Sequence, residues 1–183
     1  MKRITYLQLC KENETHFEIA KSLWLPFLKE IHAHEGVFQT ESQMEEGLRK
    51  RIAIQGTRKD MHFEVAFWDK TAVGIAMFAI DLGTVRGLLD RGHGTVMGFY
   101  IRPEYRRQGI GTDFWRHIEL VLAEDGAIGY YLCPDAVSGV PFWVRLGFEN
   151  SGLIDPDDHR PIYIRRKENT SVRKKDKHAL SLD

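Results

Sequence analysis

The chain has 183 residues, and its 26 basic and 26 acidic side chains give a formal net charge of zero. This length favours a single domain with a real core, and the charge balance argues against nucleic acid as the main partner, which usually requires a basic excess. The sequence shows no apolar run of membrane-spanning length, no signal-peptide pattern and only two cysteines, too few for a disulfide framework. We therefore expect a soluble, cytoplasmic protein that binds no membrane.

The N-terminal part predicts a short strand and two helices, over residues 4–10, 15–35 and 40–55. Apolar side chains recur at helical spacing in the first helix, and Pro26 should kink or divide it because proline lacks a backbone donor. The second helix starts with a capping box, in which Thr40 and Gln43 each satisfy a free backbone N–H of the other.

The rest of the chain predicts strands around one clear amphipathic helix over residues 109–124, and a second, short helix over residues 138–146. Strands are expected at residues 62–68, 73–80, 95–101, 128–133, 148–151 and 161–165. Residues 81–94 are polar and rich in glycine, which is typical of a long loop. The order β-α-α-β-β-β-α-β-α-β-β predicts an α/β (α+β) fold, a mixed sheet with helices on both faces.

One change in composition divides the chain. Arginine and lysine crowd residues 165–177, where apolar side chains nearly vanish. Such a segment is typical of a solvated terminus. We therefore expect one domain over residues 1–165 and a charged C-terminal tail over residues 166–183.

The strongest local signal is a strand, then Pro-Glu-Tyr, then the segment Arg106–Gly111, which opens the amphipathic helix. A helix N-terminus presents unpaired N–H groups and the positive end of the helix dipole. Gly109 and Gly111 lack a Cβ, so an anion can approach the backbone, and Arg106 and Arg107 add positive charge. These residues predict a phosphate or pyrophosphate site, which we call the cradle (residues 106–111).

The segment from Phe99 to Gly111 resembles motif A of the GNAT superfamily of N-acetyltransferases, whose pattern is Gln/Arg-x-x-Gly-x-Gly/Ala. The run from Phe142 to Phe148 resembles the end of the family's motif B, aromatic-x-x-x-Gly-Phe. The element order matches as well, so the resemblance covers residues 1–165. It implies a single-domain GNAT-like fold, with a central sheet splayed between the strands 95–101 and 128–133.

The resemblance also implies a cofactor, acetyl-coenzyme A, and the residues that bind it. The backbone of Phe99, Tyr100 and Ile101 should pair with the pantetheine arm like an added strand. The pyrophosphate should be held at the cradle and the first helical turn, by Arg106, Arg107, Gln108, Gly109, Ile110, Gly111 and Thr112. The expected activity is transfer of an acetyl group to a primary amine of a small molecule or peptide, by direct attack on the thioester.

The catalytic groups are less clearly marked. Thr95, Val96 and Met97 offer no carboxylate or histidine on the motif A strand, so we expect His93, two residues from Thr95, as the general base. Many relatives donate a proton to the thiolate from a tyrosine where this chain has Trp143, whose indole is not an acid on that scale. A phenol is available at Tyr130 or Tyr131 and a thiol at Cys133, and of these Tyr131 is our candidate donor.

The resemblance places the end of the first helix beside the acceptor. We therefore expect His32, His34 and Glu35 to bind substrate, with Glu64 as a further ligand for a cationic acceptor, and we expect no metal site. The sequence does not identify the acceptor amine. Because dimers are common among members of the family that the chain resembles, a homodimer is also possible. The alternative function is a non-catalytic acyl-CoA-binding or sensory module, which Trp143 and the missing strand carboxylate favour.

Overall fold

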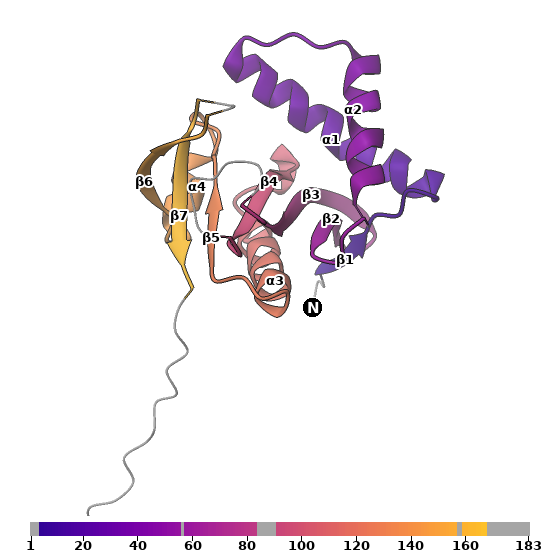
Figure 1. Ribbon diagram of the computed structural model, residues 1–183. Coiled ribbons are helices and arrows are strands. Elements are labelled where there is room, and N and C mark those ends of the chain that lie inside the picture. The colour runs from indigo at the N-terminus through magenta and orange to yellow at the C-terminus, as the bar shows by residue number, and fades with distance from the viewer. Residues whose placement is uncertain (1–3, 56, 84–90, 157–158, 168–183) are drawn as a thin grey trace, which may run out of the picture.

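The computed structural model describes residues 4–55, 57–83, 91–156 and 159–167, which form one mixed α/β layer structure (Figure 1). Most of the tail expected at residues 166–183, and the central part of the loop expected at residues 81–94, lie outside the described residues. The strands are β1 (Ile4–Gln8), β2 (Met61–Trp68), β3 (Thr71–Ile80), β4 (Gly94–Ile101), β5 (Gly129–Leu132), β6 (Glu149–Ile154) and β7 (Pro161–Arg166). The helices are α1 (Glu14–Glu35), α2 (Glu41–Ile54), α3 (Ile110–Glu124) and α4 (Val140–Arg145), with a 3-10 turn at Pro103–Tyr105.

This element order is the one predicted, and helix boundaries follow the expected local signals. The capping box of α2 is present, with Gln43 N donating to the Thr40 hydroxyl at 3.3 Å and Thr40 N donating to the Gln43 side chain at 2.8 Å. Helix α1 begins after Asn13, whose side chain accepts from His16 N, and ends at Gly36, whose φ of 67° suits glycine.

Pro26 does not divide α1, which runs continuously from Glu14 to Glu35. Proline has no N–H, so the carbonyl of Ser22, four residues earlier, loses its helical donor. Arg102, just after β4, places its Nη2 at 3.5 Å from that carbonyl and 3.2 Å from the Ser22 hydroxyl. The Arg102 guanidinium thus replaces the backbone N–H that Pro26 lacks, and it joins α1 to the end of β4.

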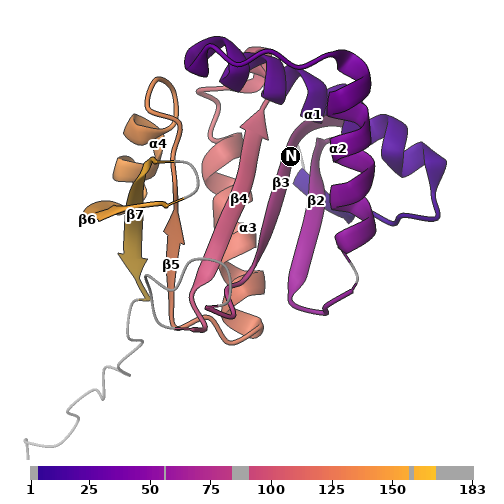
Figure 2. The same cartoon turned by 45° about the horizontal axis from the view of Figure 1, so that its top comes forward.

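The seven strands form one sheet in the order β1-β2-β3-β4-β5-β7-β6, in which only β4 and β5 are parallel (Figure 2). Pairing between β4 and β5 covers only Gly94–Val96 against Tyr130–Leu132. β4 pairs with β3 along its whole length, from Gly94 to Ile101. The sheet is therefore splayed between β4 and β5, as the family resemblance implies.

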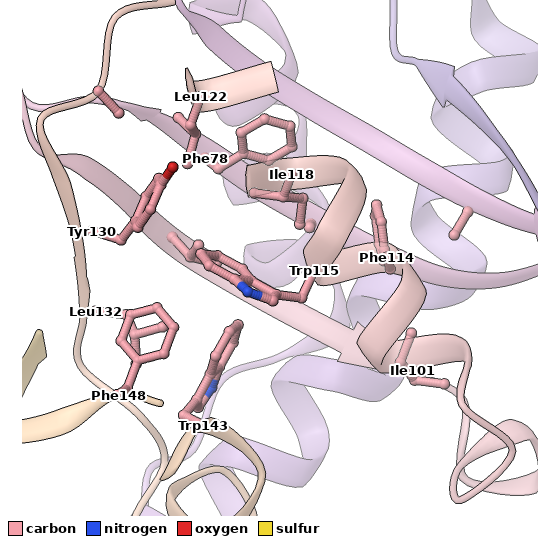
Figure 3. Close-up of a cluster of buried hydrophobic side chains, with 14 of the residues drawn as sticks. Phe78, Ile101, Phe114, Trp115, Ile118, Leu122, Tyr130, Leu132, Trp143 and Phe148 are labelled. Carbon is pink, nitrogen blue, oxygen red and sulfur yellow. The ribbon is translucent and has the colours of Figure 1, made fainter. Parts of the chain in front are cut away.

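Helices cover both faces of the sheet and bury two separate cores. Helices α1 and α2 pack on one face, where Leu23, Leu48 and Phe63 are fully buried. Helix α3 packs on the other, where Phe114, Trp115, Phe148 and neighbouring aromatic side chains form the core drawn in Figure 3. In the described part of the chain, no helix combines the length and apolar character needed to cross a membrane.

Replacing Trp115 tests how far the core of α3 stabilises the fold. Its side chain is 1% exposed and packs edge-on against Tyr130, Trp143 and Phe148 at centroid distances of 5.6, 5.4 and 5.1 Å. Trp115→Ala should lower the free energy of unfolding by about 3–5 kcal/mol in denaturant titrations followed by circular dichroism. Leu120→Ala, on the same helix but 64% exposed, is the control and should cost only about 0.5 kcal/mol. Equal losses for the two variants would contradict this packing.

Candidate active site

The central feature of the site is the edge of β4 that faces β5. Beyond Val96 and Leu132 the two strands no longer pair. Opposite β3, the register shifts so that Met77 pairs with Gly98 and Phe78 with Val96, which leaves Met97 as an extra, bulged residue. A bulge bends its strand and ends regular pairing. The edge of β4 after Met97 is thus available to another extended partner.

The hydrogen bonds at the end of β4 show which backbone groups face the gap. The amide of Arg102 donates to Val73 O on the β3 side at 2.9 Å. Because backbone groups alternate in direction along a strand, those of Tyr100 also point toward β3, and those of Phe99 and Ile101 point toward the gap. The carbonyl of Ile101 is already an acceptor for Arg106 Nε at 2.8 Å. Of the three residues expected to pair with pantetheine, Phe99 is therefore the one whose N–H and C=O are both suitably directed.

The N-terminus of α3 lies at the end of this edge and has no side-chain cap. The first-turn amides of Ile110, Gly111 and Thr112 have no partner within the helix, so they can bind an anion. Gly109 has a φ of 85°, and a Cβ built on it would meet nothing within 4 Å, so the approach to these amides is open. A Cβ on Gly111 would lie 3.3 Å from the Phe142 ring, which shows that this glycine also permits close packing of α4.

The two arginines of the cradle differ in role. Arg106 Nη2 contacts Glu30 Oε2 of α1 at 2.6 Å, Nε binds the carbonyl of Ile101, and its guanidinium carbon lies 5.4 Å from the Tyr100 ring centre. Its side chain therefore ties the cradle to β4 and α1, while it also lines the cavity, and its contact with a phosphate stays a prediction. Arg107, with a φ of 63°, has no carboxylate within ion-pair distance among the described residues. Gln108 donates to the carbonyl of Glu104 at 3.0 Å and so braces the same loop.

A cavity of about 1070 Å³ joins the cradle, the open edge of β4, the residues after β5, α4 and the C-terminal half of α1. Its three carboxylates, Glu30, Glu35 and Asp135, each have a cationic or histidine partner, at 2.6, 3.6 and 3.1 Å respectively. Among the described residues, three of its arginines have no carboxylate partner: Arg51, Arg107 and Arg145. The cavity therefore carries uncompensated positive charge, which suits an anionic ligand such as a coenzyme A phosphate.

The end of α1 borders the other side of the cavity, as expected for the acceptor. His32 and Glu35 line it, and Glu35 contacts Arg160 at 3.6 Å. His34 Nδ1 contacts Asp135 Oδ1 at 3.1 Å across the opening. Burial raises the pKa of Asp135, but hydrogen bonds from the Ser138 amide and hydroxyl and from His34 outweigh it, so the pKa lies below its ordinary value.

Glu64, expected to bind a cationic acceptor, lies outside the cavity. It is 7% exposed on β2, on the sheet face that α3 covers, and its carboxylate contacts His117 Nε2 at 2.6 Å. This contact joins β2 to α3, and neither residue is among those that line the cavity. The alternation of β2 explains the error, because Phe63 and Val65 face α1 and α2 and Glu64 must face the opposite side.

The geometry does not support the catalytic roles expected for His93 and Tyr131. The hydroxyl of Tyr131 donates to Asp81 at 2.9 Å in a buried site, and the His93 ring packs 6.5 Å from the Tyr131 ring. Both lie where β4 and β5 are still paired, and neither is among the residues that line the cavity. His93 does lie next to β4, as its spacing from Thr95 predicted. It lies at the start of that strand, however, before β4 and β5 diverge.

Trp143 lines the cavity from α4 and belongs to the aromatic core (Figure 3). Its ring lies edge-on to Phe99 at 5.1 Å, to Trp115 at 5.4 Å and to Phe148 at 5.3 Å. Its side chain is 5% exposed. Trp143 thus forms part of the cavity wall next to Phe99 of β4. The tyrosine that many relatives have at this position could instead donate a proton.

The charged residues of the cavity that were missed in the sequence include Arg51, Asp135 and Arg160. Asp135 had a usable signal, since it follows Pro134 at the carboxyl end of a strand that is parallel to its neighbour, where ligands gather. Arg51 and Arg160 had none, because their positions depend on the packing of α2 and on the turn between β6 and β7.

Comparison with known proteins agrees with this geometry. The model of the acetyltransferase (GNAT) family matches residues 21–148. A search among curated proteins gives no match.

Many solved structures share the fold. The PaiA N-acetyltransferase of Thermoplasma acidophilum, in complex with coenzyme A, is 21% identical with a TM-score of 0.63, over 90% of this chain and 99% of that one. An acetyltransferase of Thermus thermophilus is 12% identical with a TM-score of 0.66, over 90% and 97% of the two chains. The aminoglycoside N-acetyltransferase AAC(6')-Iy, in complex with coenzyme A, is 14% identical with a TM-score of 0.58, over 80% and 87%.

The family match spans most of the sequence and includes β4, the cradle, α4 and Phe148. The structural neighbours show the same fold at low identity. The chain therefore belongs to the acetyltransferase (GNAT) family.

Proposed function

We propose that this protein transfers the acetyl group of acetyl-coenzyme A to a primary amine of a small molecule or peptide. The observation that carries the proposal is the continuity of two unfilled backbone sites in one cavity, the open edge of β4 and the uncapped N-terminus of α3. The first fits an extended amide-bearing arm, and the second fits a pyrophosphate. PaiA N-acetyltransferase and AAC(6')-Iy, which share the fold, are both seen in complex with coenzyme A.

When bound, acetyl-coenzyme A supplies an activated acyl carbon, to which the amine nitrogen bonds as the carbon–sulfur bond breaks. The Phe99 N–H, directed into the gap beyond the Met97 bulge, is our candidate donor to the oxyanion that would develop on this carbon, which leaves the Phe99 carbonyl and the Ile101 N–H to pair with the pantetheine arm. Arg107, Arg145 and the first-turn amides of α3 hold the phosphates and so fix the thioester against β4. Trp143 and Phe99 exclude water from the reacting atoms.

The acceptor must lose a proton before it attacks, because an alkylamine is mostly protonated at neutral pH. His32 is the histidine that lines the cavity in the part of the chain that the structure describes, and it lies at the acceptor end of α1 near Glu35. Histidine is the side chain that most readily exchanges a proton near neutral pH. We therefore assign the acceptance of this proton to His32 in place of His93.

A second candidate, a non-catalytic acyl-CoA-binding module, is favoured by Trp143, which removes the phenol that many relatives use. Isothermal titration calorimetry with coenzyme A and thiol release from acetyl-coenzyme A with a panel of amines separate the two functions. Binding with amine-dependent thiol release supports the enzyme. Binding without release from any amine supports the module, and absence of binding would overturn both.

Reversing the charge at Arg107 tests the cradle. Arg107→Glu should weaken coenzyme A binding about tenfold or more, since a charge-assisted contact worth about 1.5–3 kcal/mol is replaced by repulsion. Calorimetric titration measures the change. Lys70→Glu, in the turn between β2 and β3, makes the same charge change away from the cavity and should leave the affinity unaltered. An unchanged affinity for Arg107→Glu would remove Arg107 from the phosphate site.

The role of Trp143 is tested by the substitution Trp143→Phe. If the indole only packs against Phe99 and Trp115, kcat should stay within about threefold and the pH profile should not move, because no proton is lost from the mechanism. Thiol release between pH 6 and about pH 9 measures both. A loss of about a hundredfold in a variant that still binds coenzyme A would instead show that the indole N–H takes part in the reaction.

Two histidine variants compare the rival proton acceptors. His32→Ala should lower kcat/KM about tenfold or more near neutral pH, and the loss should shrink as pH rises, since more of the acceptor amine is then already unprotonated. His93→Ala should stay within about threefold at every pH, because its ring is outside the cavity lining. The reverse ranking would restore His93 as the base.

A further inference from the structure

Arg51, in the last turn of α2, is a cation of the cavity that the protein does not neutralise. Its Nη1 donates a hydrogen bond to the carbonyl of Gly47, in its own helix, at 3.3 Å. In residues 4–55, 57–83, 91–156 and 159–167, no carboxylate lies within ion-pair distance of it. The cavity arginines Arg106 and Arg160, by contrast, contact Glu30 and Glu35.

Arg51 reaches the cavity from the face opposite the cradle. Its guanidinium carbon lies 5.6 Å from the centre of the Trp24 ring. That ring lies against β4 just after the Met97 bulge, since a Cβ built on Gly98 would come within 2.6 Å of it. Figure 2 shows α1 and α2 together on the face of the sheet away from α3. Arg51 is thus on the face of the sheet that α1 and α2 cover, and one indole separates it from β4 at Gly98.

The surroundings of Arg51 define what it can bind. The Arg51 side chain is exposed and so stays open to a ligand, while desolvation by its packing near Trp24 lowers its pKa below the ordinary value; a guanidinium remains charged at neutral pH all the same. The planar guanidinium favours carboxylate and phosphate, with which it forms two parallel hydrogen bonds. The cavity lining near it includes the apolar α1 side chains Trp24, Phe27 and Ile31.

We propose that Arg51 binds an anionic group, a carboxylate or a phosphate, on the same molecule that carries the acceptor amine. This inference rests on the proposed acetyl transfer and names its substrate class, an amine with an apolar body and an anionic end, such as an amino acid. Polycationic amines are disfavoured, because the carboxylates Glu30, Glu35 and Asp135 already have partners.

The test uses the full chain and acceptors matched in all but charge. Thiol release is measured with L-leucine and L-leucinamide, with O-phosphoethanolamine and ethanolamine, and with spermidine. The anionic member of at least one pair should show a kcat/KM about tenfold higher or more, and the pair that responds distinguishes carboxylate from phosphate. Arg51→Gln should abolish this preference through the KM of the acceptor, with the KM of acetyl-coenzyme A unchanged. Arg51→Lys should restore part of it.

Lys50→Gln is the matched control. It removes one positive charge from the same helix, where the Lys50 side chain is 70% exposed and pairs with Glu46, and it should change neither KM. A binding measurement supports the assignment without turnover. N-acetyl-L-leucine should bind the protein loaded with coenzyme A at least about tenfold more tightly than N-acetyl-L-leucinamide, and Arg51→Gln should remove the difference.

The possible failures are distinguishable. Absence of coenzyme A binding would overturn the proposed function itself. If leucinamide is acetylated as efficiently as leucine and ethanolamine as efficiently as O-phosphoethanolamine, or if spermidine is acetylated better than both anionic acceptors, acetyl transfer is retained and the proposed anion site at Arg51 is overturned. An Arg51→Gln variant that keeps the wild-type preference would do the same.

Discussion

The site depends on one constraint, that the backbone groups along an open strand edge need hydrogen-bond partners. The Met97 bulge and the divergence of β5 after Leu132 leave the edge of β4 unpaired in the middle of the sheet, where it is flanked by helices on both faces. A ligand with its own amide groups can complete that edge. The cradle lies at the end of the same strand, so strand pairing and phosphate binding favour the same orientation of one elongated molecule.

Most of the fold could be predicted from the sequence because its local signals agree with its tertiary structure. The capping box at Thr40, the apolar stripe of α3 and the glycines of the cradle each determine a structure within a few residues. Pro26 is the exception, since the break that it predicts is repaired by Arg102, which is distant in the sequence. A compensating contact of this kind has no local signature.

The backbone groups at the open edge of β4 and the start of α3 could be located from the sequence for the same reason, and the side chains that line the rest of the cavity could not. Backbone amides at a strand edge and a helix N-terminus follow from glycine and helix patterns, which are local. Side chains in the cavity depend on long-range packing. His93 and Tyr131 lie near the motif A strand but before the point of divergence, and Glu64 lies on the strand face that α3 covers. Arg51 lies in the last turn of α2, whose capping box marks where the helix begins and gives no information about a ligand.

The contact between Arg102 and Ser22 has a mechanical consequence. Helix α1 carries the acceptor-side residues, and at its one missing internal bond it is fastened to the residue that follows β4. A second contact, between Arg106 and Glu30, fastens the same helix two turns further on. Two side-chain contacts at either end of this stretch hold α1 against the end of β4 and the cradle, so the side chains between Ser22 and Glu30 can change in evolution without altering how the helix sits against the strand.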